Sequence, residues 1–394
     1  MSNSRSIEKI ASSIGAASMI TGALVLLLVA GHFFLGFVSW TRGLLQPPKV
    51  DIIEQQRSAR VFDGYLDKDE FFAEEAWLRN LTVHFEPYYH WRGKEIKSKY
   101  TNVGADGVRR TVHGEVRPDA KKVFVLGGST TWGAIVPDQY TIPSYLQARL
   151  GGDFRVYNYG EKGWVSTQAL NYLLQQLALG NVPDYVVFYD GANDGYVGAY
   201  SPAIPRDPHY LRVRDMNDRR HAGWTKLLVD AFDRTNYKLV LDYVARKTGS
   251  DPHKRREAGV EGKVETNARA VADLYDAHIR QVRALAAEYR FKVLFFWQPN
   301  LCASNRRDIP YEREFINRMS PLWVRSQQLV YQHAKAAFSG RERDAVFFLG
   351  DIFEDVKEPI YIDWAHLGPR GNEIIANEIA RRVMAVRLDV IPNR

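Results

Sequence analysis

Hydrophobic and polar residues follow an unusual pattern at the start of the chain. From Ile10 to Trp40 there is no Asp, Glu, Lys or Arg, and the centre of this stretch is almost continuously aliphatic. A helix needs about 20 apolar residues to cross the hydrocarbon core of a bilayer, and this stretch is longer. Phe33, Phe34 and Phe37 enrich its far end in aromatic residues, as at a membrane interface. The pattern predicts an N-terminal transmembrane helix.

A cleaved signal peptide is the alternative interpretation of the same stretch. The apolar run is longer than the hydrophobic region of most signal peptides, and no clear Ala-x-Ala cleavage site follows it. We therefore expect an uncleaved anchor. Arg5 and Lys9 precede the span and Arg42 and Lys49 follow it, so the basic residues do not favour a cytoplasmic N-terminus.

From Lys121 onward, short apolar runs alternate with segments of helical period. The runs are rich in β-branched and aromatic residues and are bounded by Gly or Asp, which is typical of buried parallel strands. Between them, apolar residues such as Val271, Tyr275 and Val282 fall on one helical face. This alternation predicts a parallel sheet covered by helices on both faces. The predicted strands are Lys122–Leu126, Phe154–Asn158, Tyr185–Tyr189, Phe291–Trp297 and Ala345–Leu349, and the predicted helices are Ile142–Leu150, Ser166–Leu179, Asn267–Tyr289, Pro321–Ala337 after an N-cap at Ser320, and Asn372–Val386.

Two segments interrupt the alternation. Residues 41–118 are polar and rich in aromatics without a clear period, and we expect a stalk and a small accessory segment that packs on the main domain. Residues of about 196–262 contain Pro202, Pro205 and Pro208 and then a polar run, and we expect an insertion near one edge of the sheet. The predicted organisation is a tail and anchor at 1–40, the accessory segment, and an α/β domain at 119–394.

Four polar clusters lie where predicted strands end. Gly127-Gly-Ser-Thr-Thr131 follows the first strand, Asn158-Tyr-Gly-Glu-Lys-Gly163 follows the second, and Asp190-Gly-Ala-Asn-Asp194 follows the third. The region after the last strand contains Asp363-Trp-Ala-His366. Ligands bind at the carboxyl ends of strands in open α/β sheets, so we expect these clusters to meet at one rim.

In this order the four clusters resemble the four sequence blocks of the SGNH (GDSL-like) hydrolase superfamily, over about residues 119–390. The resemblance implies a three-layer α/β/α, flavodoxin-like fold with a five-stranded parallel sheet. It places the nucleophile at Ser129, oxyanion donors at Gly163 and Asn193, and the Asp-x-x-His pair at Asp363 and His366. The Gly-Asp-Ser of the family is Gly-Gly-Ser here, and the missing aspartate is not a triad member.

Nucleophilic catalysis by a serine requires the same residue types, independently of the resemblance. A serine hydroxyl becomes a good nucleophile when a base such as His366 takes its proton, and a carboxylate such as Asp363 orients that imidazole. Backbone N–H groups of Ser129 and Gly163 and the Asn193 amide are suitable donors to an oxyanion. Each of these residues alone is more often a turn, cap or hinge residue, and it is the ordered set that indicates catalysis.

The sequence does not match the motifs of other nucleotide-binding or hydrolytic sites. The first cluster lacks the Lys-Ser/Thr of a P-loop, no Gly-x-Gly-x-x-Gly follows the first strand, and no Gly-x-Ser-x-Gly surrounds Ser129. Asp363-x-x-His366 has no companion cluster of metal ligands at convincing spacing. We therefore expect neither a metal nor a cofactor.

Charge and cysteine content narrow the range of partners. The formal net charge is +7, but no basic stripe with interleaved aromatics occurs, which argues against nucleic-acid binding. A net positive charge favours electrostatic attraction to anionic lipid or to an acidic glycan. Cys302 is the only cysteine, which excludes an intramolecular disulfide framework.

Together these features predict a membrane-anchored serine esterase whose catalytic domain is extracytoplasmic. The expected substrate is a small acyl ester, such as acetyl, on an envelope or exported polysaccharide. Gln298 and Tyr196 are candidate substrate contacts at the same rim. Two alternatives stay open: a polysaccharide O-acetyltransferase with the same triad, and a non-catalytic glycan-binding or assembly subunit. The sequence does not constrain protein partners.

Overall fold

The computed structural model describes residues 2–42, 52–65, 67–78, 83–200, 209, 223–233, 235–248, 261–306 and 308–388. Its backbone contacts divide the chain into two compact units, which are described separately. Unit 1 comprises residues 1–50 and 214–258, and unit 2 comprises residues 51–213 and 259–394. The chain therefore passes from one unit to the other three times.

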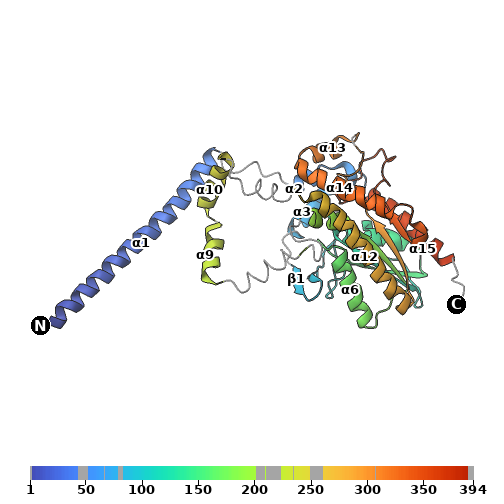
Figure 1. Ribbon diagram of the computed structural model, residues 1–394, viewed down its shortest axis with the longest axis horizontal. Coiled ribbons are helices and arrows are strands. Elements are labelled where there is room, and N and C mark those ends of the chain that lie inside the picture. Colours follow the sequence, from blue (N-terminus) through green and yellow to red (C-terminus); the bar gives the residue numbers. More distant parts are fainter. Residues whose placement is uncertain are drawn as a thin grey trace. The chain divides into compact units, whose positions relative to one another are not determined.

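The centre of unit 2 is a five-stranded parallel sheet with the order β4-β3-β5-β6-β7. Figure 1 shows the sheet among helices such as α6, α12 and α15. Numbered within the sheet, this is the order 2-1-3-4-5 of flavodoxin-like folds. The predicted fold class is therefore confirmed. The strands are β3 (Lys121–Gly127), β4 (Phe154–Gly160), β5 (Tyr185–Asp190), β6 (Lys292–Trp297) and β7 (Val346–Phe348), and all five were predicted.

Alternation along each strand builds two hydrophobic cores, because successive side chains of a strand point to opposite faces. In β3, Phe124 and Leu126 face one core, whereas Val123 and Val125 face the other. All four of these side chains are fully buried. The sheet is therefore the middle of three layers.

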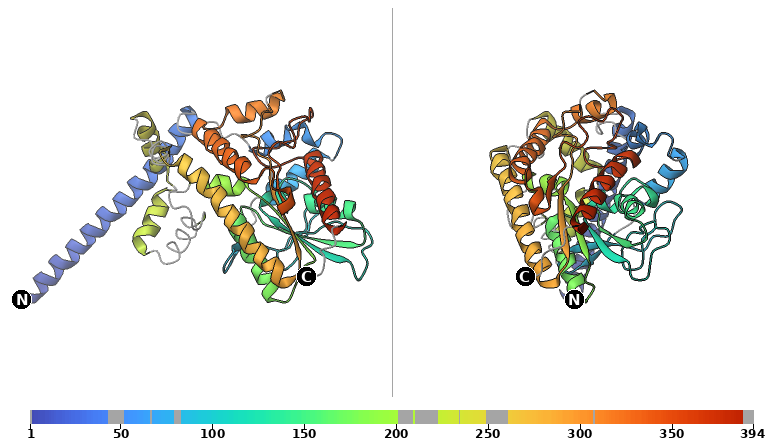
Figure 2. Two further views of the ribbon diagram at one scale, coloured as in Figure 1. Left: turned by 45° about the vertical axis from the view of Figure 1, so that its right-hand side comes forward. Right: turned by 90° about the vertical axis from the view of Figure 1, so that its right-hand side faces the viewer.

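Helices cover both faces of the sheet, and Figure 2 shows α12 and α15 on opposite sides of it. The first face carries α6 (Ser166–Ala178), α12 (Val264–Tyr289) and α14 (Pro321–Phe338), and the second carries α5 (Ile142–Leu150) and α15 (Pro369–Leu388). These five helices match the predicted ones within a few residues. The short helices α4 (Ser129–Trp132), α7 (Ala192–Tyr200) and α13 (Pro310–Asn317) were not predicted, since a few turns show little periodicity.

The segment before the sheet is not a separate stalk where the structure describes it. It contains α2 (Ile52–Arg57), η1 (Arg60–Phe62), α3 (Lys68–Leu78) and the hairpin β1 (Val83–Glu86) and β2 (His90–Gly93). Phe62, Phe71 and Phe72 are buried in one cluster with Ile135 and Ile362 of the α/β core. The compact unit that holds the sheet begins at residue 51, so the accessory segment belongs to it as a substructure that packs on the α/β core.

Unit 1 contains the long helix α1 (Ser2–Arg42), α9 (Trp224–Asp233) and α10 (Asn236–Lys247). Within α1, Ser18–Val38 is long and apolar enough to cross a membrane, and none of this window is buried. Much of the predicted insertion at 196–262 thus groups with the N-terminal helix instead of with the sheet. Residues 201–208, 210–222, 234 and 249–260 of that insertion lie outside the described residues.

Candidate active site

The first three polar clusters meet because parallel strands end at the same edge of the sheet. Gly127 at the end of β3 is in register with Gly160 of β4 and Tyr189 of β5. Just beyond the strands, the N–H of Glu161 donates to the carbonyl of Gly127 at 3.1 Å. The first three clusters are therefore level with one another at the rim.

Ser129 begins the short helix α4 immediately after a turn made by two glycines. Gly127 has φ +154°, and a side chain there would overlap the carbonyl oxygen of Tyr189. A side chain at Gly128 would overlap the Asn193 amide nitrogen. Glycine at both positions lets the chain turn sharply and brings Ser129 beside Asn193.

Ser129, His366 and Asp363, here called the rim set, are connected in series. The Oγ of Ser129 lies 2.8 Å from Nε2 of His366, and Nδ1 of His366 lies 2.7 Å from Oδ2 of Asp363. The carboxylate can only accept from Nδ1, so Nε2 is left as the acceptor for the serine hydroxyl. This is the tautomer that a general base needs.

The carboxylate of Asp363 is fully engaged. Its Oδ1 accepts the backbone N–H groups of Ala365 and His366 at 3.0 and 2.9 Å. The Gln56 amide donates to Oδ2 at 3.4 Å from α2, far earlier in the chain. Nothing in the local sequence signals this contact with Gln56.

Electrostatics in the rim set favour an ion pair. Burial alone would raise the pKa of Asp363, but the adjacent His366 and two backbone N–H groups hold it below its ordinary value. Burial alone would lower the pKa of His366, but Asp363 raises it above its ordinary value. The site can therefore stabilise an imidazolium formed when the serine loses its proton.

The loop that carries the Asp-x-x-His pair is held from several sides. The N–H of Ile362 donates to the carbonyl of His366 at 2.8 Å, and the Tyr311 hydroxyl donates to the carbonyl of Ile362 at 2.6 Å. The N–H of Leu301 donates to the carbonyl of Trp364 at 2.9 Å. The base is consequently placed by tertiary contacts and not by a regular element.

The two further oxyanion candidates lie beside the nucleophile turn. The Asn193 amide, in the first turn of α7, donates one hydrogen to the carbonyl of Trp164 at 2.8 Å and keeps a second. A side chain at Gly128 would lie 3.0 Å from that same carbonyl. Gly163, one residue earlier, has φ +77° and is half-buried. Only glycine adopts this conformation without strain.

Two residues that sequence reasoning missed hold the loop of Gly163. His209 is buried, and its Nε2–H donates to the carbonyl of Gly163 at 2.9 Å. Trp91 of β2 donates its indole N–H to the carbonyl of Lys162 at 2.8 Å, and its ring packs edge-on against His209. One comes from the insertion and the other from the accessory segment, so no motif could have signalled them.

The two candidate substrate contacts differ in position. Gln298 is buried and accepts a hydrogen bond from the Thr130 hydroxyl at 3.0 Å, which suits a support for the nucleophile helix better than a contact with substrate. Tyr196 of α7 is 48% exposed. Its ring lies 5.6 Å from that of Trp364, which in turn packs edge-on against Trp323 at 5.2 Å. An aromatic surface therefore adjoins the loop of His366.

A second group of serine, histidine and aspartate, here called the buried set, comprises Ser166, His278 and Asp194. The Ser166 hydroxyl lies 2.9 Å from Nδ1 of His278 and is also hydrogen-bonded to Asp194. The carboxylate accepts the Ser166 N–H at 3.0 Å as well. Burial lowers the pKa of His278 to about 4 and raises that of Asp194. All three side chains are less than 8% exposed.

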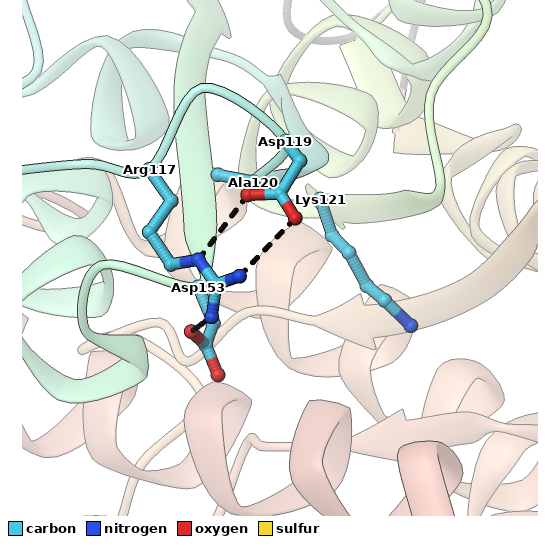
Figure 3. A pocket seen from close by; sticks show the side chains of 5 residues that line it. All are labelled: Arg117, Asp119, Ala120, Lys121 and Asp153. Carbon is cyan, nitrogen blue, oxygen red and sulfur yellow. Dashed lines mark hydrogen bonds and ion pairs between the residues drawn. The ribbon is translucent and has the colours of Figure 1, made fainter.

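The pocket in Figure 3 lies at the other end of the sheet. Lys121 begins β3, at the opposite end of that strand from Ser129, and Asp153 lies just before β4. Arg117 is ion-paired with both Asp119 and Asp153, and all three side chains are exposed. These groups neutralise one another at the surface and are remote from the rim set.

Comparison with known proteins gives matches in structure alone. No family model and no curated protein matches the sequence. Solved structures that are similar include a carbohydrate acetylesterase family member from Sinorhizobium meliloti, at 16% identity over 68% of this chain and 100% of the other, with a TM-score of 0.37. A member of the lipolytic protein G-D-S-L family from Veillonella parvula matches at 14% identity over 69% and 100%, with a TM-score of 0.33.

A third match is LAE5, an alpha/beta hydrolase enzyme from the metagenome of Lake Arreo, at 14% identity over 69% of this chain and 99% of that one, with a TM-score of 0.35. The matches thus include esterases and proteins of the G-D-S-L family that the four clusters resemble. The expected SGNH-type fold is confirmed by the strand order, and the first three clusters lie at strand ends.

Proposed function

We propose that this protein is a serine esterase in which Ser129 is the nucleophile, His366 the general base and acid, and Asp363 the group that orients the imidazole. The observation that carries the proposal is the pair of contacts in series, 2.8 Å from Ser129 to His366 and 2.7 Å from His366 to Asp363. Backbone N–H groups of Ser129 and Gly163 and the free hydrogen of the Asn193 amide are the proposed oxyanion donors.

The proposed reaction has two halves. The Oγ of Ser129 attacks the acyl carbonyl carbon while its proton passes to Nε2 of His366. The oxyanion then collapses, and the imidazolium gives that proton to the leaving alcohol. In the second half, water attacks the acyl-enzyme, His366 takes a proton from the water and returns it to Ser129, and the carboxylic acid leaves. Asp363 stays ionised throughout, in keeping with its lowered pKa.

The proposed substrate is an acyl ester, in particular an acetyl ester, of a carbohydrate. The exposed ring of Tyr196, backed by Trp364 and Trp323, supports this choice. Aromatic faces bind sugar rings with little loss of side-chain entropy, and Trp364 lies between Asp363 and His366 in the sequence. An ester panel from acetyl to long-chain acyl groups, with aryl and sugar alcohols, tests this. Replacing Tyr196 with Ala should raise KM for acetylated sugars and leave p-nitrophenyl acetate nearly unaffected.

A fluorophosphonate probe tests the nucleophile directly. We expect the full-length protein to be labelled and the Ser129→Ala variant to remain unlabelled. Ser166→Ala is the matched control, because it removes a second serine that is hydrogen-bonded to a histidine, and it should still be labelled. Equal labelling of wild type and Ser129→Ala would reject the assignment.

We also propose that α1 anchors the protein in a membrane and that unit 2 is extracytoplasmic. The uncharged stretch and its exposed side chains support the anchor. Protease added to intact cells or spheroplasts should degrade unit 2. Protection of unit 2 that is lost on lysis would place it in the cytoplasm instead.

A further inference from the structure

Unit 1 joins two parts of the chain that are about 200 residues apart, because α10 is hydrogen-bonded to α1. The Tyr237 hydroxyl donates to the carbonyl of Leu28 at 2.8 Å. The Asn236 amide donates to the carbonyl of His32 at 2.8 Å, and the backbone N–H of Asn236 donates to Nδ1 of His32 at 3.1 Å. The first turn of α10 therefore binds the C-terminal half of the Ser18–Val38 span.

Glycines in α1 make this contact possible. A side chain at Gly31 would overlap the Tyr237 hydroxyl, and one at Gly36 would lie 2.6 Å from the Asn236 amide nitrogen. Gly22, on the same helix, has nothing within 4 Å. Small residues that allow close approach, together with polar side chains that bond across, are the usual means by which helices associate inside membranes.

The helices α9 and α10 expose apolar side chains of their own. On α9, Leu228, Val229 and Phe232 are 69%, 55% and 42% exposed, and their spacing puts them on one face. On α10, Leu241 and Val244 are 55% and 48% exposed. This apolar surface is part of the same compact unit as the exposed aliphatic side chains of α1.

The charge of this part of the sequence suits a lipid surface as well. Residues 214–258 contain eleven Lys or Arg and seven Asp or Glu, so more than half of the net charge of +7 comes from this stretch. Lys247 is exposed, and its ammonium lies 5.9 Å from the ring centre of Tyr243. Basic residues beside a span attract anionic headgroups, and Tyr and Lys are typical of the membrane interface.

We propose that α9 and α10 form a second membrane-associating element, in which α10 packs on α1 and the apolar face of α9 binds bilayer lipid. The inference rests on the proposed membrane span in α1 and goes beyond the proposed esterase. The contacts lie in the half of the span that leads to residue 51, so the element belongs to the leaflet from which the chain continues into unit 2. In consequence α1 is a permanent structural partner of the insertion and not a removable signal.

Lipid contact is tested with single-cysteine variants of the full-length protein, made on a Cys302→Ser background and carrying an environment-sensitive fluorophore. Phe232→Cys is the test position. Leu179→Cys is the matched control, because Leu179 is an apolar side chain of unit 2 that is 73% exposed. The proteins are placed in nanodiscs of phosphatidylcholine and phosphatidylglycerol, with and without brominated acyl chains.

We expect brominated lipid to quench the label at 232 severalfold more than the label at 179. Equal quenching at the two positions would overturn the proposal. A blue shift at 232 that depends on protein concentration and is insensitive to bromine would overturn it in favour of a second copy of the chain. Hydrolysis of p-nitrophenyl acetate by the same samples reports the proposed function separately, so the failure of either idea is distinguishable from that of the other.

The contact between α10 and α1 is tested with Gly31→Leu, and Gly22→Leu is its control on the same helix. The leucine side chain should displace the Tyr237 hydroxyl and break its hydrogen bond to Leu28. We expect this to free α10 and to make trypsin cleavage at Lys238 and Lys247 roughly tenfold faster in nanodiscs. Gly22→Leu should match the wild type. Equal cleavage rates for the two variants would overturn the packing of α10 on α1, and unchanged esterase activity would show that unit 2 is folded in both.

Discussion

The rim set and the buried set use the same three residue types but connect them in different orders. In the rim set, the imidazole lies between the hydroxyl and the carboxylate, so a proton leaving Ser129 has an acceptor that is itself stabilised by Asp363. In the buried set, the hydroxyl lies between the imidazole and the carboxylate. There the hydrogen bonds are satisfied when His278 donates to Ser166 and Ser166 donates to Asp194.

The surroundings separate the two sets further. The carboxylate raises the pKa of His366, whereas burial lowers the pKa of His278 to about 4 and leaves it neutral at pH 7. Ser129 is partly accessible, whereas Ser166 is 1% exposed and cannot meet a substrate. Residue types are therefore insufficient to make a hydrolytic site, because the order of contacts and access to solvent decide the chemistry.

The largest difference in activity is expected when the serine of each set is replaced with alanine. Ser129→Ala should lower kcat/KM for p-nitrophenyl acetate by at least about 10⁴-fold, because it removes the hydroxyl that is hydrogen-bonded to Nε2 of His366. Ser166→Ala should keep kcat/KM within about tenfold of the wild-type value, since Ser166 is a buried residue that supports the fold beneath the rim. If both variants lose activity equally with intact circular dichroism spectra, the distinction between the sets fails.

Substitution of the two aspartates should reduce kcat by very different factors, nearly as different as for the two serines. Asp363→Asn should lower kcat by roughly 10⁴-fold, because the amide favours the wrong tautomer of His366. Asp194→Asn should mainly lower the free energy of unfolding, by about 1–3 kcal/mol, through a disturbed buried hydrogen bond. Steady-state kinetics and urea denaturation of both variants separate the effects, and a stable Asp363→Asn protein with near-normal kcat would contradict the assignment.

The oxyanion donors provide a finer test of the rim. Asn193→Ala should lower kcat by about 10²–10³-fold with little change in KM, because an oxyanion donor acts mainly in the transition state. A change confined to KM would instead indicate that Asn193 binds the ground state of the substrate.

The buried set should appear in stability rather than in rate. Unfolded His278 takes up a proton near pH 6.5, but folded His278 does so only near pH 4, so the unfolded state binds more protons in between. This group should therefore cost about 2 kcal/mol of stability when the pH falls from 7 to 5. Urea titrations of wild type and His278→Gln at both pH values test this, and an unchanged pH dependence in the variant would show that His278 is not responsible.

The smallest expected effect is on the acid limb of the pH–rate profile. His366 must be unprotonated to act as a base, so kcat/KM should fall about tenfold per pH unit below its pKa. Because Asp363 raises that pKa, the midpoint should lie above 6.5 in the wild type. In Asp363→Asn the midpoint of the residual activity should move down, and a midpoint that stays in place would show that the carboxylate does not set it.

Local pattern was sufficient to predict the elements of the α/β core and the positions of the candidate site in the sequence. Strand runs such as Tyr185–Tyr189 are apolar because both faces of the sheet are covered, and that composition is visible without coordinates. Ser129, Gly163 and Asn193 were predictable because each follows a strand, and parallel strands end at one rim. The buried set was not predictable, since Ser166, Asp194 and His278 are distant in sequence and belong to no common motif.

The sequence by itself therefore determined the sheet, its covering helices, the apolar span and the residue types at the rim, because these depend on periodicity and on strand ends. Only the tertiary structure decided that Gln56 bonds Asp363, that His209 and Trp91 hold the oxyanion loop, and that α10 pairs with α1. Each of these contacts joins segments separated by at least about 45 residues. The energy of such a contact depends on where the whole fold places its two ends, and that position leaves no mark on either segment alone.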